Sequence, residues 1–259
     1  VNMHQQDMRT LVGERDERAV QSAAAALQSE LHHRMATVSS MAVLASEDIS
    51  FKDIFATTTD LAKDFNGGIA FLNTDGHLIE KTGNDRFWGW VSQNSYSIKL
   101  ASSSSPQLVF SDPTLDPNSN QLFVIISAYS DSRDVIVAGA FSPETLASET
   151  LTPTYPAGSH VTIYLLDNSR RILFVSGALE RESLDADHPG VAEALAGRSG
   201  VLYVKKEATE HVVAYSPIET AGWALITEEE WEMVISPSLQ LTQMAPLVMV
   251  PAFILALIA

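Results

Sequence analysis

Arg86 is the side chain in this sequence best suited to bind a small anion, and it stands two residues before Trp88. A guanidinium group can donate two parallel hydrogen bonds to a carboxylate, a geometry that lysine cannot match. Trp88 and Trp90 alternate along the chain as they would in a strand or loop, and they could wall an apolar pocket. The competing roles are a surface ion pair of Arg86 with Asp85 or a neighbouring acidic residue, and core packing of the two tryptophans.

Two further pairs of side chains are candidates for the same site. Phe110 and Asp112 end one apolar run, and Tyr129 and Asp131 end another, which we expect to be a central strand. Side chains at the end of such a strand can point into the mouth of a pocket. Turn formation is the competing role of both aspartates, since Asp112 precedes a proline and Asp131 lies in a polar stretch.

The sequence carries no motif of an enzyme or a metal site. Cysteine is absent, which excludes thiolate ligands and cysteine nucleophiles. No zinc-protease, P-loop, nucleophile-elbow or dinucleotide motif occurs. The seven histidines are scattered, and the adjacent pair His32 and His33 would point about 100° apart on a helix. The run 228–230 of three glutamates fits a solvated helix start better than a metal site. We therefore predict a non-catalytic chain that needs no cofactor.

The charge of the chain is strongly negative, with 32 acidic against 16 basic residues and a net charge of -16. This balance argues against a nucleic-acid partner and against binding to an anionic lipid surface. Residues 233–259 nevertheless carry no charge and end in 13 apolar residues, which we interpret as the beginning of a transmembrane segment. We expect the rest to be an extracytoplasmic region, periplasmic or extracellular, that is held at the cell membrane by flanking transmembrane helices.

The elements that must position the candidate site begin with a long helix. No glycine or proline occurs in the 53 residues between Gly13 and Gly67, which favours helix. Apolar residues spaced by three or four predict one amphipathic helix over about residues 5–47, and the opposite face includes Arg15, Asp16 and His32. A capping box at 50–53 predicts a second helix that runs towards Phe65. The apolar face of the long helix consists of Val20, Ala24, Leu27, Leu31, Met35, Val38, Met41 and Ala45.

Two hairpin patterns follow, at residues 68–83 and 161–177, and they align with an offset of 94 residues. Each hairpin is followed by further strand-like runs. Each of the two repeated segments then ends with a strand that begins at or near a glycine. The sequence therefore predicts an α/β (α+β) fold, in which a long N-terminal helix precedes two tandem modules with antiparallel sheets. The other expected strands are 107–110, 122–129, 135–141, 201–204, 211–215 and 222–226, with a small helix at 188–196.

The order of these elements resembles the double-Cache domain, the tandem PAS-like sensor found outside the membrane in bacterial and archaeal receptors. The resemblance covers nearly the whole chain. It implies a stalk helix at 1–47, a membrane-distal ligand-binding module at 48–150, a membrane-proximal module at 151–231, and a helix entering the membrane at 232–259. The motifs that carry it are Leu-Asn-Thr-Asp-Gly at 72–76, Phe-Ser-Asp-Pro-Thr-Leu-Asp-Pro at 110–117, Tyr-Leu-Leu-Asp at 164–167, Ala-Leu-Ala-Gly-Arg-Ser-Gly at 194–200, Ala-Tyr-Ser-Pro-Ile at 214–218 and Gly-Trp-Ala-Leu-Ile-Thr-Glu-Glu at 222–229.

The resemblance also implies the composition of the ligand site. In members that bind amino acids, an Arg-x-Trp-Tyr motif holds the carboxylate, and two aspartates grip the ammonium group. This sequence has Gly89 in place of the tyrosine and Phe141 in place of the final-strand aspartate. We therefore expect a small organic acid, an amino-acid-like compound or an uncharged apolar molecule. The expected ligand-binding residues are Phe71, Arg86, Trp88, Trp90, Phe110, Asp112, Tyr129 and Asp131.

The functional hypothesis is a small-molecule sensor in a transmembrane signalling receptor. Ligand binding in the distal module would displace a helix at 228–241, and this displacement would pass the signal to a cytoplasmic output domain. A histidine kinase is the first expectation for that domain. A chemoreceptor or a diguanylate cyclase output is the alternative. The long helix is expected to form a homodimer, to pack on its own modules, or both. A different class of function, a protein-interaction module without a small ligand, stays open.

Overall fold

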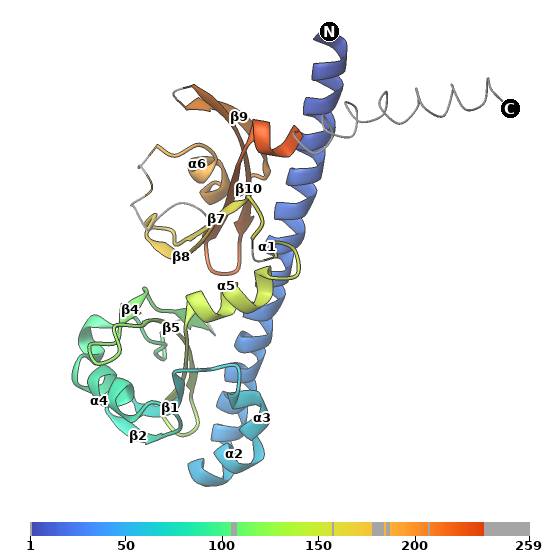
Figure 1. Cartoon of the computed structure of the whole chain (residues 1–259). Coiled ribbons are helices and arrows are strands. Elements are labelled where there is room, and N and C mark those ends of the chain that lie inside the picture. Colours follow the sequence, from blue (N-terminus) through green and yellow to red (C-terminus); the bar gives the residue numbers. More distant parts are fainter. Residues whose placement is uncertain are drawn as a thin grey trace, which may run out of the picture.

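The computed structural model of the chain describes residues 2–104, 108–156, 158–177, 184, 187–206 and 208–235, with side chains from residue 6 onward. One long helix, α1, runs beside two sheets that are stacked end to end along it (Figure 1). We call the sheet of strands β1–β6 and its helices the first module, and strands β7–β11 with helix α6 the second module. The expected fold class is confirmed.

Helix α1 spans Asn2–Ser46, as its breaker-free sequence predicts. Of the apolar face expected from the sequence, every residue is buried except Met35, which is partly buried. The helix contacts both sheets, so one continuous core joins α1 to both modules. Asp16 departs from the expected pattern: it lies on the predicted polar face but is buried.

The second helix is shorter than the sequence suggests. Helix α2 spans Phe51–Thr57, and the Ser50 hydroxyl accepts a hydrogen bond from the Asp53 backbone N–H, as expected of a capping box. The chain then breaks at Thr58, and a separate helix, α3, covers Thr59–Ala62. The expectation of one helix towards Phe65 is therefore wrong.

The first module is built on an antiparallel sheet with strand order β2-β1-β6-β5-β3, and β4 also pairs with β5. Helix α4 covers one face of this sheet and α1 covers the other (Figure 1). The elements are β1 (Gly68–Asn73), β2 (Leu78–Lys81), α4 (Asp85–Gln93), the 3-10 helix η1 (Ser95–Ser97), β3 (Val109–Phe110), β4 (Thr114–Leu115), β5 (Leu122–Ser130), β6 (Val135–Phe141) and α5 (Pro143–Leu151).

The second module repeats this plan. Its antiparallel sheet has the order β8-β7-β11-β10-β9, so its last strand again pairs with its first. The expected boundary at residue 150 falls inside α5, which precedes the second sheet. The elements are β7 (Thr162–Leu166), β8 (Ile172–Ser176), α6 (Val191–Leu195), β9 (Gly200–Lys206), β10 (Thr209–Ile218) and β11 (Trp223–Glu230).

Fine details of the two hairpins repeat with the offset of 94 residues. The pairing register is irregular after Phe71 in the first hairpin and after Leu165 in the second. Asn73 and Asp167 each accept a backbone N–H four residues ahead with a side-chain oxygen. The turn residue with positive φ is Gly76 in the first hairpin and Arg170 in the second. Such agreement indicates a duplicated module.

The sequence after β11 leads out of the second module. The run 228–230 forms the end of β11, so the expectation that it begins a solvated helix is wrong, and Glu228 is buried. Residues 231–235 are helical. The expected transmembrane segment and the rest of the expected helix to residue 241 lie outside the described residues. Within the described part of the chain, no helix has the length and apolar character needed to span a membrane.

Candidate functional site

The clearest candidate site lies under helix α4, which carries the Arg-x-Trp sequence. The helix begins after Asn84, whose side-chain oxygen accepts a hydrogen bond from the Phe87 backbone N–H. The strand or loop expected for Trp88 and Trp90 is therefore wrong. On a helix, two residues at positions i and i+2 are related by a turn of about 200°, so these two side chains point to nearly opposite sides. Accordingly, Trp88 is fully buried, whereas Trp90 is only partly buried at the edge of the same core.

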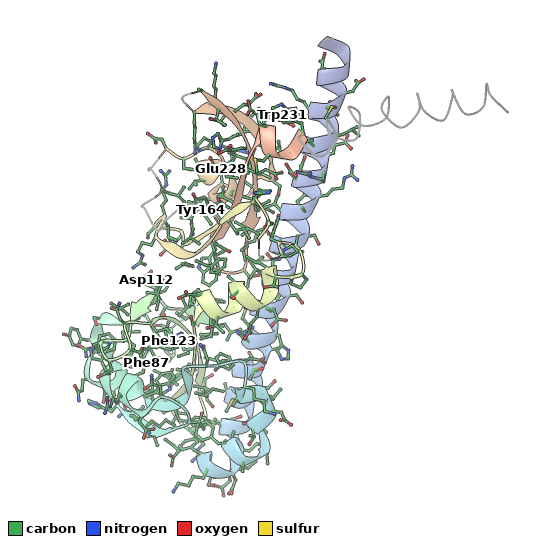
Figure 2. All side chains as sticks on the ribbon, viewed as in Figure 1. Phe87, Asp112, Phe123, Tyr164, Glu228 and Trp231 are labelled. Atoms are coloured by element: carbon green, nitrogen blue, oxygen red, sulfur yellow. The ribbon has the colours of Figure 1, made fainter. Side chains whose placement is uncertain are left out.

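The space between α4 and the first sheet is an apolar interior. The Phe87 ring lies 5.5 Å from Trp88 and 4.8 Å from Phe123 of β5, centroid to centroid. Figure 2 shows Phe87 and Phe123 lying together in the first module. Ser127 is the polar side chain of β5 in this region, and its hydroxyl accepts the Ala101 backbone N–H at 2.9 Å. The other buried side chains here belong to Ala70, Leu72, Val91, Ile98, Val109, Ile125, Ile136, Ala138 and Ala140.

One polar atom in this interior lacks a partner. The indole Nε1 atom of Trp88 is buried and makes no hydrogen bond to any residue that the structure describes. An unsatisfied buried donor costs about 1–3 kcal/mol, so nearly all such groups in proteins are paired. An oxygen atom of a bound molecule, in a carboxylate or a carbonyl group, would satisfy it. A bound ligand would therefore account for the unpartnered donor of Trp88.

Arg86 lies on the other side of α4 from Trp88, because two residues on a helix turn through about 200°. Its side chain is exposed and makes no ion pair or hydrogen bond within the described part of the chain. The competing role, an ion pair with Asp85, is not formed, since Asp85 pairs with Lys81 instead. Arg86 is thus available to an anion, but at the surface.

The remaining expected site residues are distributed over other parts of the first module. Phe71 and Phe110 pack in the core shared with α1, and Phe71 stacks on Phe51 at 4.3 Å. Tyr129 is half-buried at the edge of the core under α4, and its hydroxyl donates a hydrogen bond to Asp134. Asp131 is exposed in the turn after β5, where its competing role as a turn residue places it.

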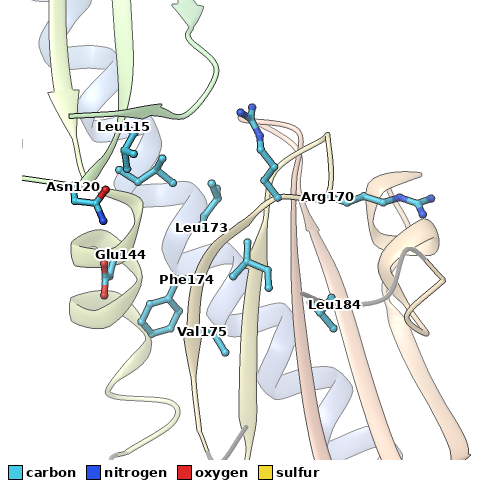
Figure 3. A pocket seen from close by; sticks show the side chains of 11 residues that line it. Leu115, Asn120, Glu144, Arg170, Leu173, Phe174, Val175 and Leu184 are labelled. Carbon is cyan, nitrogen blue, oxygen red and sulfur yellow. The ribbon is translucent and has the colours of Figure 1, made fainter. Parts of the chain in front are cut away.

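Asp112 lies at the junction of the two modules (Figure 2). It is exposed, and its carboxylate is 3.7 Å from the guanidinium group of Arg171 in the second module. Nearby, a cleft of about 550 Å³ separates Leu115 and Asn120 of the first module from Leu173 and Phe174 of β8 (Figure 3). Apolar and polar side chains both line this cleft. Asp112 is therefore placed to contact the second module and not the interior under α4.

A group of residues in the second module escaped sequence reasoning. The buried carboxylate of Glu228 lies 2.9 Å from His188, 2.9 Å from His211 and 2.6 Å from Lys206. Burial alone would raise the pKa of Glu228, but hydrogen bonds from His188 and Lys206 outweigh burial and lower it to about 2. These residues are 17 to 40 positions apart from Glu228, so no spacing rule could find them. Within the described residues, no group of three or more possible ligands is arranged to hold a metal ion.

Comparisons of the sequence with protein-family models and with curated proteins find no match. Comparison with solved structures finds sensor domains of the same fold. The extracellular domain of rpHK1S-Z16, described as a histidine kinase, matches with a TM-score of 0.63 and 15% sequence identity, over 90% of this chain and 98% of that chain.

Two ligand-binding domains of chemoreceptors are also similar. The domain of CtaA from Pseudomonas fluorescens, in complex with L-isoleucine, matches with a TM-score of 0.60 and 16% identity, over 91% of this chain and 97% of that chain. The domain of PctB from Pseudomonas aeruginosa, in complex with L-Gln, matches with a TM-score of 0.56 and 13% identity, over 90% of this chain and 98% of that chain. The long helix and two tandem sheets are therefore the fold of double-Cache sensor domains, as the resemblance implies.

Proposed function

We propose that this chain is the extracytoplasmic small-molecule-sensing region of a transmembrane signalling receptor. The observation that supports this function best is the buried, unpartnered indole N–H of Trp88 in the first module. Its position under α4 makes it a binding donor inside the module that the resemblance assigns to the ligand. The solved sensor domains of the same fold include complexes with L-isoleucine and L-Gln, which support a small organic ligand.

The ligand is a small molecule with an oxygen acceptor and an apolar body. Trp88 donates to its oxygen, and the apolar side chains between α4 and the sheet surround the rest. On β6, the residues that face α4 are Ile136, Ala138 and Ala140, so this strand offers no carboxylate for an ammonium group. A small organic acid therefore fits better than an α-amino acid. Arg86, at the surface of α4, attracts the carboxylate.

Binding requires α4 to move from the sheet, since side chains fill the interior in this structure. Ligand binding then stabilises a second arrangement of the first module, which is how a ligand shifts a conformational equilibrium. Helix α1 contacts both modules and carries the change to the second one. Strand β11 and the helical residues after it pass the displacement towards the membrane.

The output of the receptor is a histidine kinase in this proposal, with a chemoreceptor or a diguanylate cyclase as the alternative. The similarity to the extracellular domain of rpHK1S-Z16 supports the first, and the similarity to CtaA and PctB supports the second. The exposed apolar side chains Leu11 and Val43 on α1 support pairing of two copies of the chain along this helix.

Thermal unfolding in the presence of small organic acids, amino acids and neutral apolar compounds tests the function. A ligand at about 100 times its Kd should raise Tm by about 5–10 °C. Trp88→Phe removes the donor but keeps an aromatic ring, and we expect it to abolish most of the shift. Arg86→Ala should weaken the effect of carboxylates and leave that of neutral compounds unchanged.

Trp90→Phe is the matched control, because Trp90 lies at the edge of the same core. The ligand-induced shift should survive in this variant. The competing function, a protein-interaction module without a small ligand, is favoured by the filled interior under α4. It would be supported if no compound class raises Tm. If Trp88→Phe responds to every compound as the wild type does, the chain binds a small ligand but Trp88 is not its donor.

A further inference from the structure

Residues 231–235, which we call the exit segment, follow the last strand of the second module without belonging to its sheet. The last paired residue of β11 is Glu230, opposite His211 of β10, and the helical exit segment begins at the next residue. Backbone pairing therefore holds β11 in place but does not fix the direction of the exit segment. Side-chain contacts of this segment decide how it lies relative to α1.

Arg9 of α1 contacts the first residue of the exit segment. Its guanidinium carbon lies 5.6 Å from the centroid of the Trp231 ring and 5.3 Å from the centroid of the Tyr203 ring on β9. The two rings meet edge to face, with their centroids 5.8 Å apart. Figure 2 shows Trp231 beside α1 at the end of the second module. A guanidinium within about 6 Å of an aromatic centroid is attracted to the ring, so Arg9 binds both rings at once.

The second module holds Arg9 in this position. The Nη2 atom of Arg9 donates to both carboxylate oxygens of Glu210 on β10, at 2.7 and 2.6 Å. The Tyr203 hydroxyl donates to the backbone carbonyl oxygen of Arg9. Gly13 lies one turn further along α1, and a methyl group there would come within 3.3 Å of the Tyr203 hydroxyl oxygen. The absence of a side chain at Gly13 therefore leaves room for Tyr203 against the helix.

Arg9 differs in its target from Arg15, which also joins α1 to the second module. Arg15 pairs with Glu229, a residue within β11. Loss of that pair would leave β11 in the sheet, because β11 is hydrogen-bonded to β10 on one side and to β7 on the other. Arg9 instead contacts Trp231, which lies beyond the paired residues. Arg9 is therefore placed to control the direction of the exit segment.

We propose that Arg9 is a positioning residue that clamps the exit segment to the N-terminal part of α1, so that the two move as one body. Sliding of the exit segment along α1 would pull the Trp231 ring away from the guanidinium group and is opposed by the clamp. A shift of α1 relative to the sheets carries the exit segment with it. The clamp exists in the chain without a ligand, and only its role in signalling rests on the function proposed above.

Distance measurements between two spin labels follow the exit segment in the 259-residue chain without ligand. The chain has no cysteine, so labels can be attached to Ser22→Cys on α1 and Glu232→Cys in the exit segment, both at exposed positions. We expect a narrow distance distribution when Arg9 is present. A cation–π contact at an exposed site changes an equilibrium constant by about two- to fivefold, so Arg9→Ala should raise the population of displaced distances by that factor for each ring. An unchanged distribution in Arg9→Ala would overturn the proposal.

Arg18→Ala is the matched control variant, because Arg18 pairs with Glu14 on the exposed surface of the same helix, and its distribution should stay narrow. A second pair of labels, at Ser22→Cys and Glu230→Cys, follows the end of β11 itself. This pair should stay narrow in Arg9→Ala, since the sheet holds β11. Equal broadening of both pairs would mean that the whole second module has loosened from α1, and it would overturn the clamp.

A combined substitution tests whether Arg9 acts through Trp231. Trp231→Leu removes the ring and should broaden the distribution between Ser22→Cys and Glu232→Cys as Arg9→Ala does. In the Trp231→Leu background, Arg9→Ala should cause no further broadening, because its target ring is gone. Additive broadening would overturn the assignment of Arg9 as the positioning residue of this segment. Because no ligand is present, failure of the clamp is distinguishable from failure of the proposed function, which the ligand-induced shift of Tm tests.

Discussion

Glu228 shows how a nearly fully buried carboxylate stays charged in this protein. Three cationic or donor side chains surround it, and together they outweigh the cost of burial. We predict that Glu228→Gln lowers the free energy of unfolding at pH 7 by about 3 kcal/mol, because it removes the buried charge that His188, Lys206 and His211 share. Urea unfolding followed by circular dichroism measures the change.

The pH dependence of unfolding gives a second readout at this residue. Because the folded pKa of Glu228 is lowered to about 2, its contribution is fully present above about pH 4.5 and is lost as the pH falls towards 2. Glu228→Gln should lack this loss, and the exposed control Glu230→Gln should keep it. The account of Glu228 is wrong if both variants lose stability equally in acid.

At the scale of single elements, α4 is both the cover of the candidate site and a helix with a weak point. Gly89 lies inside it, and a methyl group at this position would meet no atom within 4 Å. We predict that Gly89→Ala stabilises the chain by about 0.5–1 kcal/mol, because alanine favours helix over glycine. Tm should rise by about 2–4 °C for each kcal/mol.

The control for this substitution is Gly139→Ala on β6. There the added methyl group would lie 2.5 Å from the Phe65 ring, so we expect a loss of about 1–3 kcal/mol through overpacking. A drop in Tm for Gly89→Ala would show that α4 is not a continuous helix at this position.

Elements with a long or repeated pattern could be predicted from the sequence, and short ones could not. The 45 residues of α1 and the two hairpins follow directly from periodicity and turn residues. Trp88 and Trp90 stand at alternate positions, which is the period of a strand, so this short run predicts a strand or loop although it forms α4. The contacts of Asp16 and Glu228 arise only when distant segments meet. Their polar residue type alone therefore predicts, wrongly, that both residues lie at the surface.

The candidate site could also be predicted only in part, because residue types are visible in the sequence but the directions of the side chains are not. The importance of the Arg-x-Trp run could be inferred from residue type, and Trp88 does carry the unpartnered donor. The geometry of this run could not be inferred, because it depends on whether the residues form a strand, with 180° per residue, or a helix, with 100° per residue. As a helix, α4 places Arg86 at the surface and Trp88 inside.

At the scale of the whole molecule, α1 makes the two modules one mechanical unit. A single apolar core includes residues of α1 and of both sheets. The end of β11 lies beside the N-terminal half of α1, where Arg15 contacts Glu229. The first sheet and the end of β11 are therefore both in contact with the same helix.

The indole N–H signals of the four tryptophans test the central claim most directly, namely that the first module binds its ligand through Trp88. A ¹⁵N–¹H spectrum of the chain contains one such signal for each tryptophan, and the signal lost in Trp88→Phe is that of Trp88. On addition of a compound that raises Tm, this signal should move further than those of Trp90, Trp223 and Trp231. An unchanged Trp88 signal in the presence of a saturating, stabilising ligand would contradict the account.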